Sequence, residues 1–171
     1  MVAGCLKRLV PHLMLVLATA SVTGAEVAEV GHPPPLFALP DEEGQVHRLE
    51  DLLGAPIVLY FTHNMCHYCT QVIRFLKRAR ARYSDAELTI LTLNVWADGP
   101  KLIRRYKEQF GLTFPMLAGK DSQLLRNYEV NYVPIIVFIG RDGRIRRIFH
   151  HYILADDFQA SVREIVLTDG G

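Results

Sequence analysis

Apolar positions along the chain follow two periodicities, which separate its predicted strands from its predicted helices. Continuous apolar runs rich in β-branched residues are typical of strands buried on both faces of a sheet. The runs of this kind are 56–61, 88–95 and 133–139, with a shorter extended piece at 114–117. Apolar residues spaced three and four apart, with charged residues between them, are typical of amphipathic helices. This spacing predicts helices over 69–83, 100–110, 121–128 and 156–167.

Turn signals add two antiparallel pairs to these elements. Residues 36–39 and 46–49 are predicted to form a hairpin, with Gly44 in its turn. The sequence Gly-Arg-Asp-Gly at 140–143 predicts a tight turn, which returns the chain as a strand over 144–150.

The order of the elements predicts a mixed sheet between helices. Strands joined through a helix run parallel, whereas a tight turn forces an antiparallel pair. The chain is therefore expected to form an α/β domain of thioredoxin-like topology, with a mixed central sheet flanked by helices and an N-terminal β-hairpin. Asp98 is the expected N-cap of the helix over 100–110, and Gly111 is its expected end.

The first 25 residues have the composition of an export signal. Lys7 and Arg8 precede an apolar run over 9–18, and small-x-small patterns suited to signal cleavage follow at 18–20 and 23–25. The apolar run is shorter than the roughly 20 residues of a membrane-spanning helix. We therefore expect a secretory signal over 1–25 and a periplasmic location. If left uncleaved, the same segment would anchor the protein to the inner membrane.

A Pro-rich stretch separates this signal from the predicted domain. Residues 26–35 end in Gly-His-Pro-Pro-Pro, a composition that favours a stiff, extended linker. The domain is expected over 36–171, which is long enough to bury a hydrophobic core without disulfide staples. The net charge of +1 argues against nucleic acid as a partner, because binding phosphates requires a strongly positive surface.

The three cysteines point to redox chemistry rather than to structural cross-linking. Cys5 lies in the predicted signal, which leaves Cys66 and Cys69 in the domain. A ring closed across two intervening residues removes little unfolded-state entropy, so it would add little stability. A structural zinc site would need a second ligand pair, and His150-His151 is the only adjacent histidine pair in the sequence. We therefore expect no metal at the cysteines.

The pair lies at the junction between the strand over 56–61 and the helix that follows it. Unsatisfied N–H groups at the start of a helix favour an anion, so Cys66 is predicted to be the nucleophilic thiolate. Cys69 lies one turn later and is predicted to resolve a mixed disulfide. Between the cysteines, His67 and Tyr68 are assigned as residues that tune the site, because a partly charged imidazole favours the thiolate.

These features resemble the TlpA/ResA-like thioredoxins of the redoxin (AhpC/TSA) superfamily. The stretches that carry the resemblance are 36–39, Gly44, 49–52, 57–61 with Cys66-His67-Tyr68-Cys69, 128–130, Val133-Pro134 and 138–143. The resemblance implies an exported thiol–disulfide oxidoreductase that has no bound cofactor and acts on protein thiols and disulfides. It also implies a membrane redox partner and a reducing role, in cytochrome c maturation or in disulfide repair.

The family pattern also assigns a substrate-binding site. Its proline, here Pro134, is cis and faces the cysteine pair. The resemblance therefore implies that the backbone of Val133 pairs with an incoming peptide and that Pro134 keeps metals from the thiols.

Three positions depart from the pattern of related proteins. Met65 stands where a Trp commonly precedes the first cysteine, so the exposed docking surface differs. Tyr60 stands where thioredoxin has a buried Asp, and Val72 stands where ResA-like proteins have a Glu. Proton transfer at Cys69 must then use water or another group. The missing acids, together with His67, favour a milder reductant or an oxidant.

Two other functions fit parts of the pattern. A copper-binding protein of the SCO type would use soft and imidazole ligands, although that family spaces its cysteines as CxxxC. The residues available for this purpose are His63, Cys66, His67, Cys69, His150 and His151. For the last two, two arrangements stay open: one of them borders the site, or they belong to an alternating edge strand with one side chain in solvent. A peroxiredoxin-like peroxidase would need a Thr three residues, and a Pro seven residues, before its cysteine. This chain has His63 and Leu59 at those positions.

Overall fold

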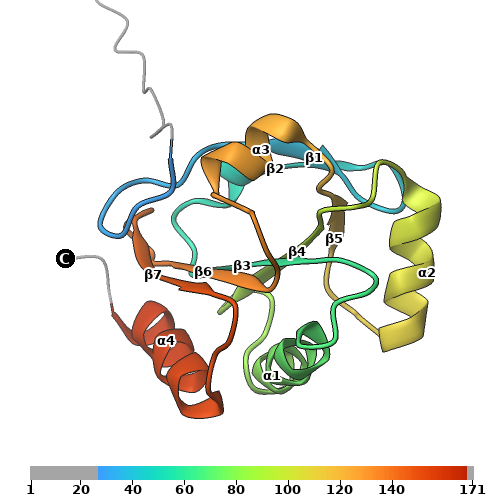
Figure 1. The fold of residues 1–171 in the computed structure, drawn as a ribbon. Coiled ribbons are helices and arrows are strands. Elements are labelled where there is room, and N and C mark those ends of the chain that lie inside the picture. The colour runs from blue at the N-terminus through green and yellow to red at the C-terminus, as the bar shows by residue number, and fades with distance from the viewer. Residues whose placement is uncertain (1–26, 169–171) are drawn as a thin grey trace, which may run out of the picture.

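The computed structural model describes residues 27–168, which form a five-stranded sheet between helices and a separate hairpin (Figure 1). The strands of the main sheet are β3 (Ile57–Thr62), β4 (Thr89–Asn94), β5 (Met116–Ala118), β6 (Ile135–Ile139) and β7 (Ile145–His150). The helices are α1 (Cys69–Arg82), α2 (Pro100–Phe110), α3 (Ser122–Asn127) and α4 (Ala155–Leu167). The hairpin consists of β1 (Ala38–Pro40) and β2 (Val46–Arg48), followed by a 3₁₀ turn, η1 (Leu49–Leu52).

The sheet has the order β5-β4-β3-β6-β7, with β3 in the centre. Strand β3 runs parallel to β4 and antiparallel to β6, and β7 is antiparallel to β6. This arrangement confirms the predicted mixed sheet and thioredoxin-like topology. As a result, the C-terminal ends of β3, β4 and β7 and the N-terminal end of β6 meet at one edge of the sheet.

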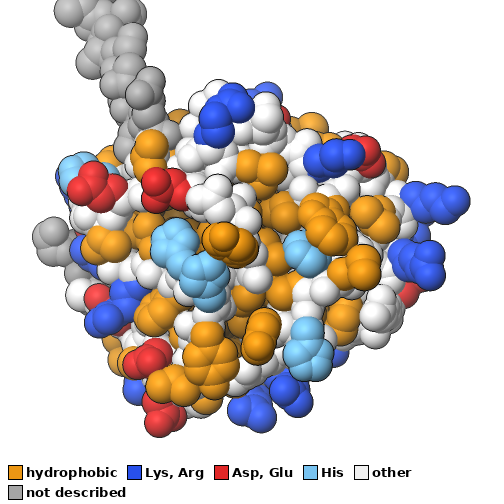
Figure 2. Space-filling model, in the orientation of Figure 1, with side chains coloured by type: hydrophobic (Ala, Val, Ile, Leu, Met, Phe, Trp, Pro, Cys, Tyr) orange, Lys and Arg blue, Asp and Glu red, His pale blue; other side chains and the backbone are white. Residues whose placement is uncertain are grey.

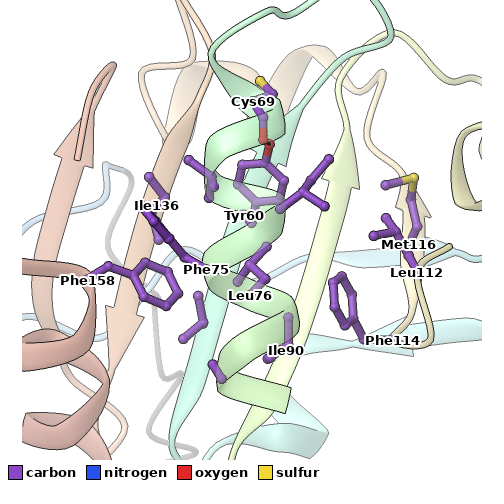
Figure 3. Close-up of a cluster of buried hydrophobic side chains, with 14 of the residues drawn as sticks. Tyr60, Cys69, Phe75, Leu76, Ile90, Leu112, Phe114, Met116, Ile136 and Phe158 are labelled. Carbon is purple, nitrogen blue, oxygen red and sulfur yellow. Dashed lines mark hydrogen bonds between the residues drawn. The ribbon is translucent and has the colours of Figure 1, made fainter. Parts of the chain in front are cut away.

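The apolar run of β3 is continuous because both faces of the strand are covered. Val58 and Tyr60 point into a core shared with α1, α2 and α4, part of which is shown in Figure 3. Ile57, Leu59 and Phe61 point into a second core, which includes residues of α3 and the hairpin. Figure 1 shows α1 and α4 on one side of the sheet and α3 with the hairpin on the other.

The predicted N-cap of α2, Asp98, is wrong, whereas its predicted end at Gly111 is confirmed. Helix α2 begins after Gly99 with Pro100 in its first turn, and no side chain caps its N-terminus. The carboxylate of Asp98 instead accepts a hydrogen bond from Lys120 Nζ at 3.1 Å. Gly111 ends the helix in the left-handed conformation, with φ of 55°, which glycine adopts without a steric penalty.

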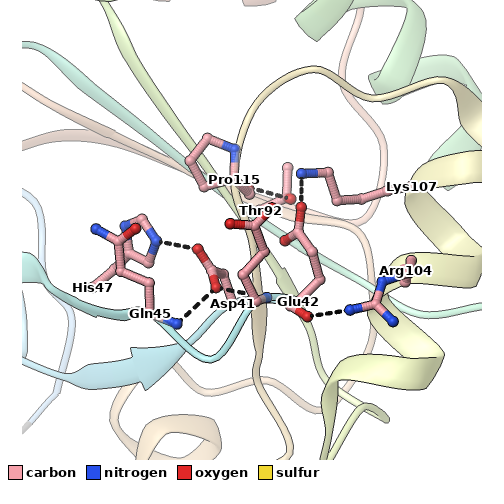
Figure 4. A network of polar contacts seen from close by, with 9 residues as sticks. Asp41, Glu42, Gln45, His47, Thr92, Arg104, Lys107 and Pro115 are labelled. Atoms are coloured by element: carbon pink, nitrogen blue, oxygen red, sulfur yellow. Dashed lines mark hydrogen bonds and ion pairs between the residues drawn. The ribbon is translucent and has the colours of Figure 1, made fainter.

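A charged cluster ties the hairpin to the rest of the domain (Figure 4). Asp41 accepts hydrogen bonds from the backbone N–H groups of Glu43 and Gln45, both at 2.9 Å, and lies 2.7 Å from His47 Nε2. Burial opposes ionisation of Asp41, but these hydrogen bonds outweigh it and lower the pKa of the carboxyl group.

Two cations of α2 extend this cluster. The ammonium of Lys107 pairs with the carboxylate of Glu42, and Arg104 donates to the Glu42 carbonyl at 2.9 Å. We call the residues Asp41, Glu42, His47, Arg104 and Lys107 the hairpin network.

The predicted boundary between linker and domain at Leu36 is too late. The N–H of Ala28 donates to the carbonyl of Asn127 at 2.7 Å, and the N–H of Gly31 donates to the carbonyl of Ile145 at 2.8 Å. Pro34 and Pro35 are buried. Proline has no N–H to leave unsatisfied, so these residues can pack against the domain instead of spanning solvent. The predicted export signal over 1–25 lies outside the described residues. Within residues 27–168, no helix is long and apolar enough to cross a membrane.

Candidate functional site

A disulfide joins Cys66 and Cys69 where the chain passes from β3 into α1. Their Cα atoms lie 5.3 Å apart. The two residues differ in access to solvent, because Cys66 is partly exposed whereas Cys69 is completely buried. Only Cys66 therefore lies where a second protein could reach it.

Cys66 lies outside α1, but a backbone N–H at the start of this helix contacts its sulfur. The helix begins at Cys69 with Tyr68 as its N-cap, so Cys66 lies in the preceding turn. The N–H of Cys69, a first-turn donor, nevertheless lies 3.1 Å from Cys66 Sγ. A thiolate on Cys66 would accept this hydrogen bond and would lie at the positive end of the helix dipole.

A cis peptide bond between Val133 and Pro134 faces the disulfide, as the family resemblance implied. The carbonyl oxygen of Val133 lies 3.7 Å from Cys66 Sγ, and β6 begins directly afterwards at Ile135. The backbone at Val133 therefore borders the more accessible cysteine. Its role in binding a substrate stays a prediction.

His63 is held against the end of β4. Its ring stacks on the indole of Trp96, with centroids 3.8 Å apart and parallel planes. The N–H of Met65 donates to His63 Nδ1 at 3.1 Å. Partial burial lowers the pKa of the imidazole, which favours its neutral form. A side-chain hydrogen bond of 2.8 Å, from Asn94 to Asn64, makes a second link between this loop and β4.

Sequence reasoning did not assign Trp96 or Asn94 to the site. One signal could have found them, because both lie at the end of the strand predicted over 88–95. Parallel strands end at the same edge of a sheet, so residues that follow one strand lie near those that follow its neighbour.

His67 and Tyr68, the predicted tuning residues, are both exposed. Their rings lie edge to face, with centroids 5.9 Å apart. Their position between the cysteines is as expected, and their effect on the redox pair stays a prediction.

One of the two C-terminal histidines borders the site, an arrangement that the sequence left open. The N–H of His151 donates to the carbonyl of Pro134 at 2.9 Å, and its ring lies 5.1 Å from that of Tyr132. His150 is the register partner of Ile135 at the same edge of the sheet. The end of β7 therefore supports the cis-proline segment.

Large apolar side chains are exposed around this edge. They come from the cysteine loop and from the segments that flank β4, β6 and β7, namely Met65, Tyr68, Trp96, Tyr132, Tyr152 and Leu154. Figure 2 shows hydrophobic and histidine side chains at the centre of the viewed face, with Lys and Arg towards its margin.

The position at which thioredoxin has a buried Asp holds a hydroxyl group in this chain. Tyr60 is completely buried, and its Oη lies 3.0 Å from the carbonyl oxygen of Cys69 (Figure 3). Val72, which stands where ResA-like proteins have a Glu, is also buried.

The geometry of the described residues gives little support to a copper-binding or a peroxidase function. Across residues 27–168, no three His, Cys, Asp or Glu side chains converge to hold a metal ion. Leu59 is buried in the second core and His63 stacks on Trp96, so the positions that would shape a peroxide pocket serve packing.

Comparison with known proteins agrees with this geometry. The model of the AhpC/TSA family matches residues 30–148. The chain is 31% identical over 137 residues to thiol-disulfide oxidoreductase ResA of Geobacillus thermodenitrificans, an alignment that covers 80% of this chain and 78% of the relative.

Two solved structures share the fold. One is the thioredoxin domain of a thiol-disulfide oxidoreductase from Bacteroides vulgatus, with a TM-score of 0.69 at 19% identity over 81% of this chain and 98% of that one. The other is a secreted Mycobacterium tuberculosis disulfide oxidoreductase, with a TM-score of 0.65 at 21% identity over 75% and 95%. Since the family model spans most of the chain, including both cysteines, and a relative 31% identical over 80% of the chain is named a thiol-disulfide oxidoreductase, this chain belongs to the AhpC/TSA family and is a thiol–disulfide oxidoreductase.

Proposed function

We propose that this oxidoreductase reduces protein disulfides outside the cytoplasm, with Cys66 as the attacking thiolate and Cys69 as the resolving thiol. One observation carries the assignment of the two roles. Cys66 is accessible and receives the first N–H of α1, whereas Cys69 is buried. An attacking sulfur needs both access and a stabilised negative charge, and only Cys66 combines them.

The exchange has two steps. The Cys66 thiolate attacks one sulfur of a substrate disulfide, so that bond breaks and the other substrate sulfur leaves as a thiolate, which takes up a proton. The Cys69 thiol then loses its proton and attacks Cys66, which releases the second substrate sulfur. The substrate gains two electrons, and the enzyme ends as the Cys66–Cys69 disulfide. A dithiol on a membrane redox partner returns it to the reduced form.

The substrate is expected to be a polypeptide that lies across the cis-proline segment. The Val133 carbonyl lies next to Cys66, so an extended strand that pairs with this backbone would bring its own sulfur to Cys66. The exposed apolar side chains around the edge would contact the flanking residues of the substrate.

Export is supported by the signal-like composition of residues 1–25. One structural neighbour is itself described as secreted. If the segment stays attached, it would hold the enzyme at the membrane beside its redox partner. The reducing role in this compartment, with cytochrome c maturation as one process that needs it, follows from the family resemblance.

Trapping of mixed disulfides tests the two cysteine roles. Cys69→Ser should accumulate adducts between Cys66 and substrate, because the resolving step is lost. Cys66→Ser should form none at the redox site, because Cys69, the other sulfur of the pair, is buried. The adducts are resolved by non-reducing electrophoresis after acid quenching. Adducts in Cys66→Ser, with none in Cys69→Ser, would reverse the assignment.

The reduction potential tests the direction of the reaction. A value near or below about −270 mV, in the range of thioredoxin, is expected of a reductant. A value near roughly −120 mV, in the range of strong periplasmic oxidants, would make the protein a disulfide donor instead.

A further inference from the structure

Three buried hydroxyl groups form a series of contacts that begins at the backbone carbonyl of Cys69. Tyr60 Oη lies 3.0 Å from the carbonyl oxygen of Cys69 and 3.2 Å from Thr62 Oγ1. Thr62 Oγ1 in turn lies 2.8 Å from Tyr106 Oη. We call Tyr60, Thr62 and Tyr106 the hydroxyl chain. Figure 3 shows the ring of Tyr60 pointing along α1 towards Cys69.

The hydroxyl chain is buried and uncharged. The exposed fractions of Tyr60 and Thr62 are 0%, and that of Tyr106 is 1%. Burial raises the pKa of both tyrosines, so they stay neutral over the working pH range. A buried hydroxyl without a partner is costly, and in this chain each hydroxyl finds one in the next.

The hydroxyl chain joins three elements at the second cysteine. Tyr60 and Thr62 belong to β3, Tyr106 belongs to α2, and Cys69 is the first residue of α1. His67 and Tyr68, in the turn before Cys69, are exposed to solvent. The contact that holds the start of α1 against the core is therefore the one between Tyr60 and the Cys69 carbonyl. A donor aimed at a backbone oxygen fixes the position of a residue and leaves its sulfur free to react.

We infer that Tyr60 is a positioning residue for Cys69, which keeps the buried sulfur in reach of Cys66 during the resolving step. The inference rests on the proposed role of Cys69. The position is the one at which thioredoxin has a buried Asp. Tyr60 supplies a neutral hydroxyl there, directed at the backbone, where the Asp would supply a charge near the sulfur.

Removal of the single hydroxyl tests this role. In Tyr60→Phe the first turn of α1 loses the hydrogen bond between Tyr60 and the Cys69 carbonyl. The effective concentration of Cys69 at Cys66 should therefore fall by roughly threefold to tenfold, which corresponds to the free energy of one hydrogen bond. The disulfide then forms less readily, and the reduction potential should rise by about 15 to 30 mV. The mixed disulfide with glutathione should resolve more slowly by a similar factor. Both are measured in the full chain, the first in glutathione redox buffers and the second by stopped-flow.

Tyr128→Phe is the matched control. The hydroxyl of Tyr128 is also buried and donates to a backbone carbonyl, that of Pro35 at 2.7 Å, but it lies in the core on the other face of the sheet. This variant should lower the midpoint of urea unfolding as Tyr60→Phe does, with the potential and the resolving rate unchanged. An equal loss of stability in the two variants, with neither redox quantity altered in Tyr60→Phe, would overturn the inference.

A second variant keeps the test decisive if Tyr60→Phe does not fold. Thr62→Val cuts the link to Tyr106 and leaves Tyr60 beside Cys69, so a smaller rise in potential is expected. An unchanged potential in a folded Thr62→Val would then overturn the inference. The trapping experiment is separate, because adducts on Cys69 instead of Cys66 would overturn the proposed function whatever the Tyr60 variant does.

Discussion

Helix α2 contributes to two polar clusters that are built from opposite kinds of group. Tyr106 ends the hydroxyl chain beneath the disulfide, whose members are neutral and buried. The next residue, Lys107, belongs to the hairpin network, whose members are ionisable and range from the buried Asp41 to the exposed Arg104. The same helix therefore supports the redox site with hydroxyl groups and the peripheral hairpin with charges.

The difference follows from the cost of burial. A buried ion loses several kcal/mol of hydration unless it is well paired, whereas a hydroxyl in a chain of hydroxyls keeps its hydrogen bonds. Neutral groups also leave the charge near a reacting sulfur unchanged when the pH changes. We therefore expect substitutions in the hairpin network to alter stability alone. Substitutions at the edge of the sheet where β3 leads into the cysteine pair, which we call the disulfide edge, are expected to alter redox behaviour.

The largest effect is expected from breaking the ion pair of the hairpin network. In Lys107→Met, Glu42 loses its cation while its side chain stays only 15% exposed. The free energy of unfolding should fall by about 2–3 kcal/mol, because an unpaired carboxylate stays largely buried. Urea unfolding measures the loss, and Lys101→Met, an exposed position on the same helix, serves as control. A changed reduction potential would break the division between the two clusters.

Asp41→Asn should have a smaller effect that depends on pH. The folded protein lowers the pKa of Asp41, so its ionised form adds stability above the usual value of 3.8. That stability is lost as the pH falls through 3.8 and below, where the folded state also takes up the proton. The substitution should cost about 1–2 kcal/mol at pH 7 and less at pH 3, as followed by urea unfolding at the two pH values. An equal cost at both would show that the charge of Asp41 contributes nothing.

His63 sharpens the comparison, because it is a titratable group at the disulfide edge. Its lowered pKa means that the unfolded chain binds the proton more readily, so stability should fall as the pH falls below 6.5. Protonation also removes the acceptor for the N–H of Met65. Trp96, the only tryptophan in the chain, should report this change by its fluorescence. In His63→Phe the stacking partner stays but the titration should vanish; a transition that persists would belong to another group.

The smallest expected effect is that of His67. A cation near Cys66 stabilises the thiolate and so raises the reduction potential. Because the His67 side chain is exposed, solvent screens its charge, and His67→Gln should lower the potential by less than about 30 mV. Equilibration with glutathione measures this shift, with Tyr68→Phe as control. An unchanged potential in His67→Gln would remove His67 from the tuning residues.

Much of the fold could be predicted from local pattern. The hairpin, the central strand before Cys66 and the amphipathic helix after Cys69 all appear where periodicity and turn residues place them. The packing of 28–35 was missed, because a Pro-rich composition has the same appearance in a free linker and in a segment laid against a domain. Asp98 was misassigned for a related reason, since its choice between a helix N-terminus and Lys120 depends on a contact 22 residues away.

The sequence by itself determined the chemistry of this protein: a redox pair at a strand-to-helix junction and a Val-Pro step before a later strand. Both are set by neighbouring residues, so no distant contact had to be known. Only the tertiary structure decided what surrounds the pair. Trp96 lies on His63, His151 holds Pro134, and Tyr60 anchors Cys69, because sheet order and helix packing bring these side chains together. Such contacts join residues from 9 to more than 30 positions apart, and their geometry exists only once the sheet has formed.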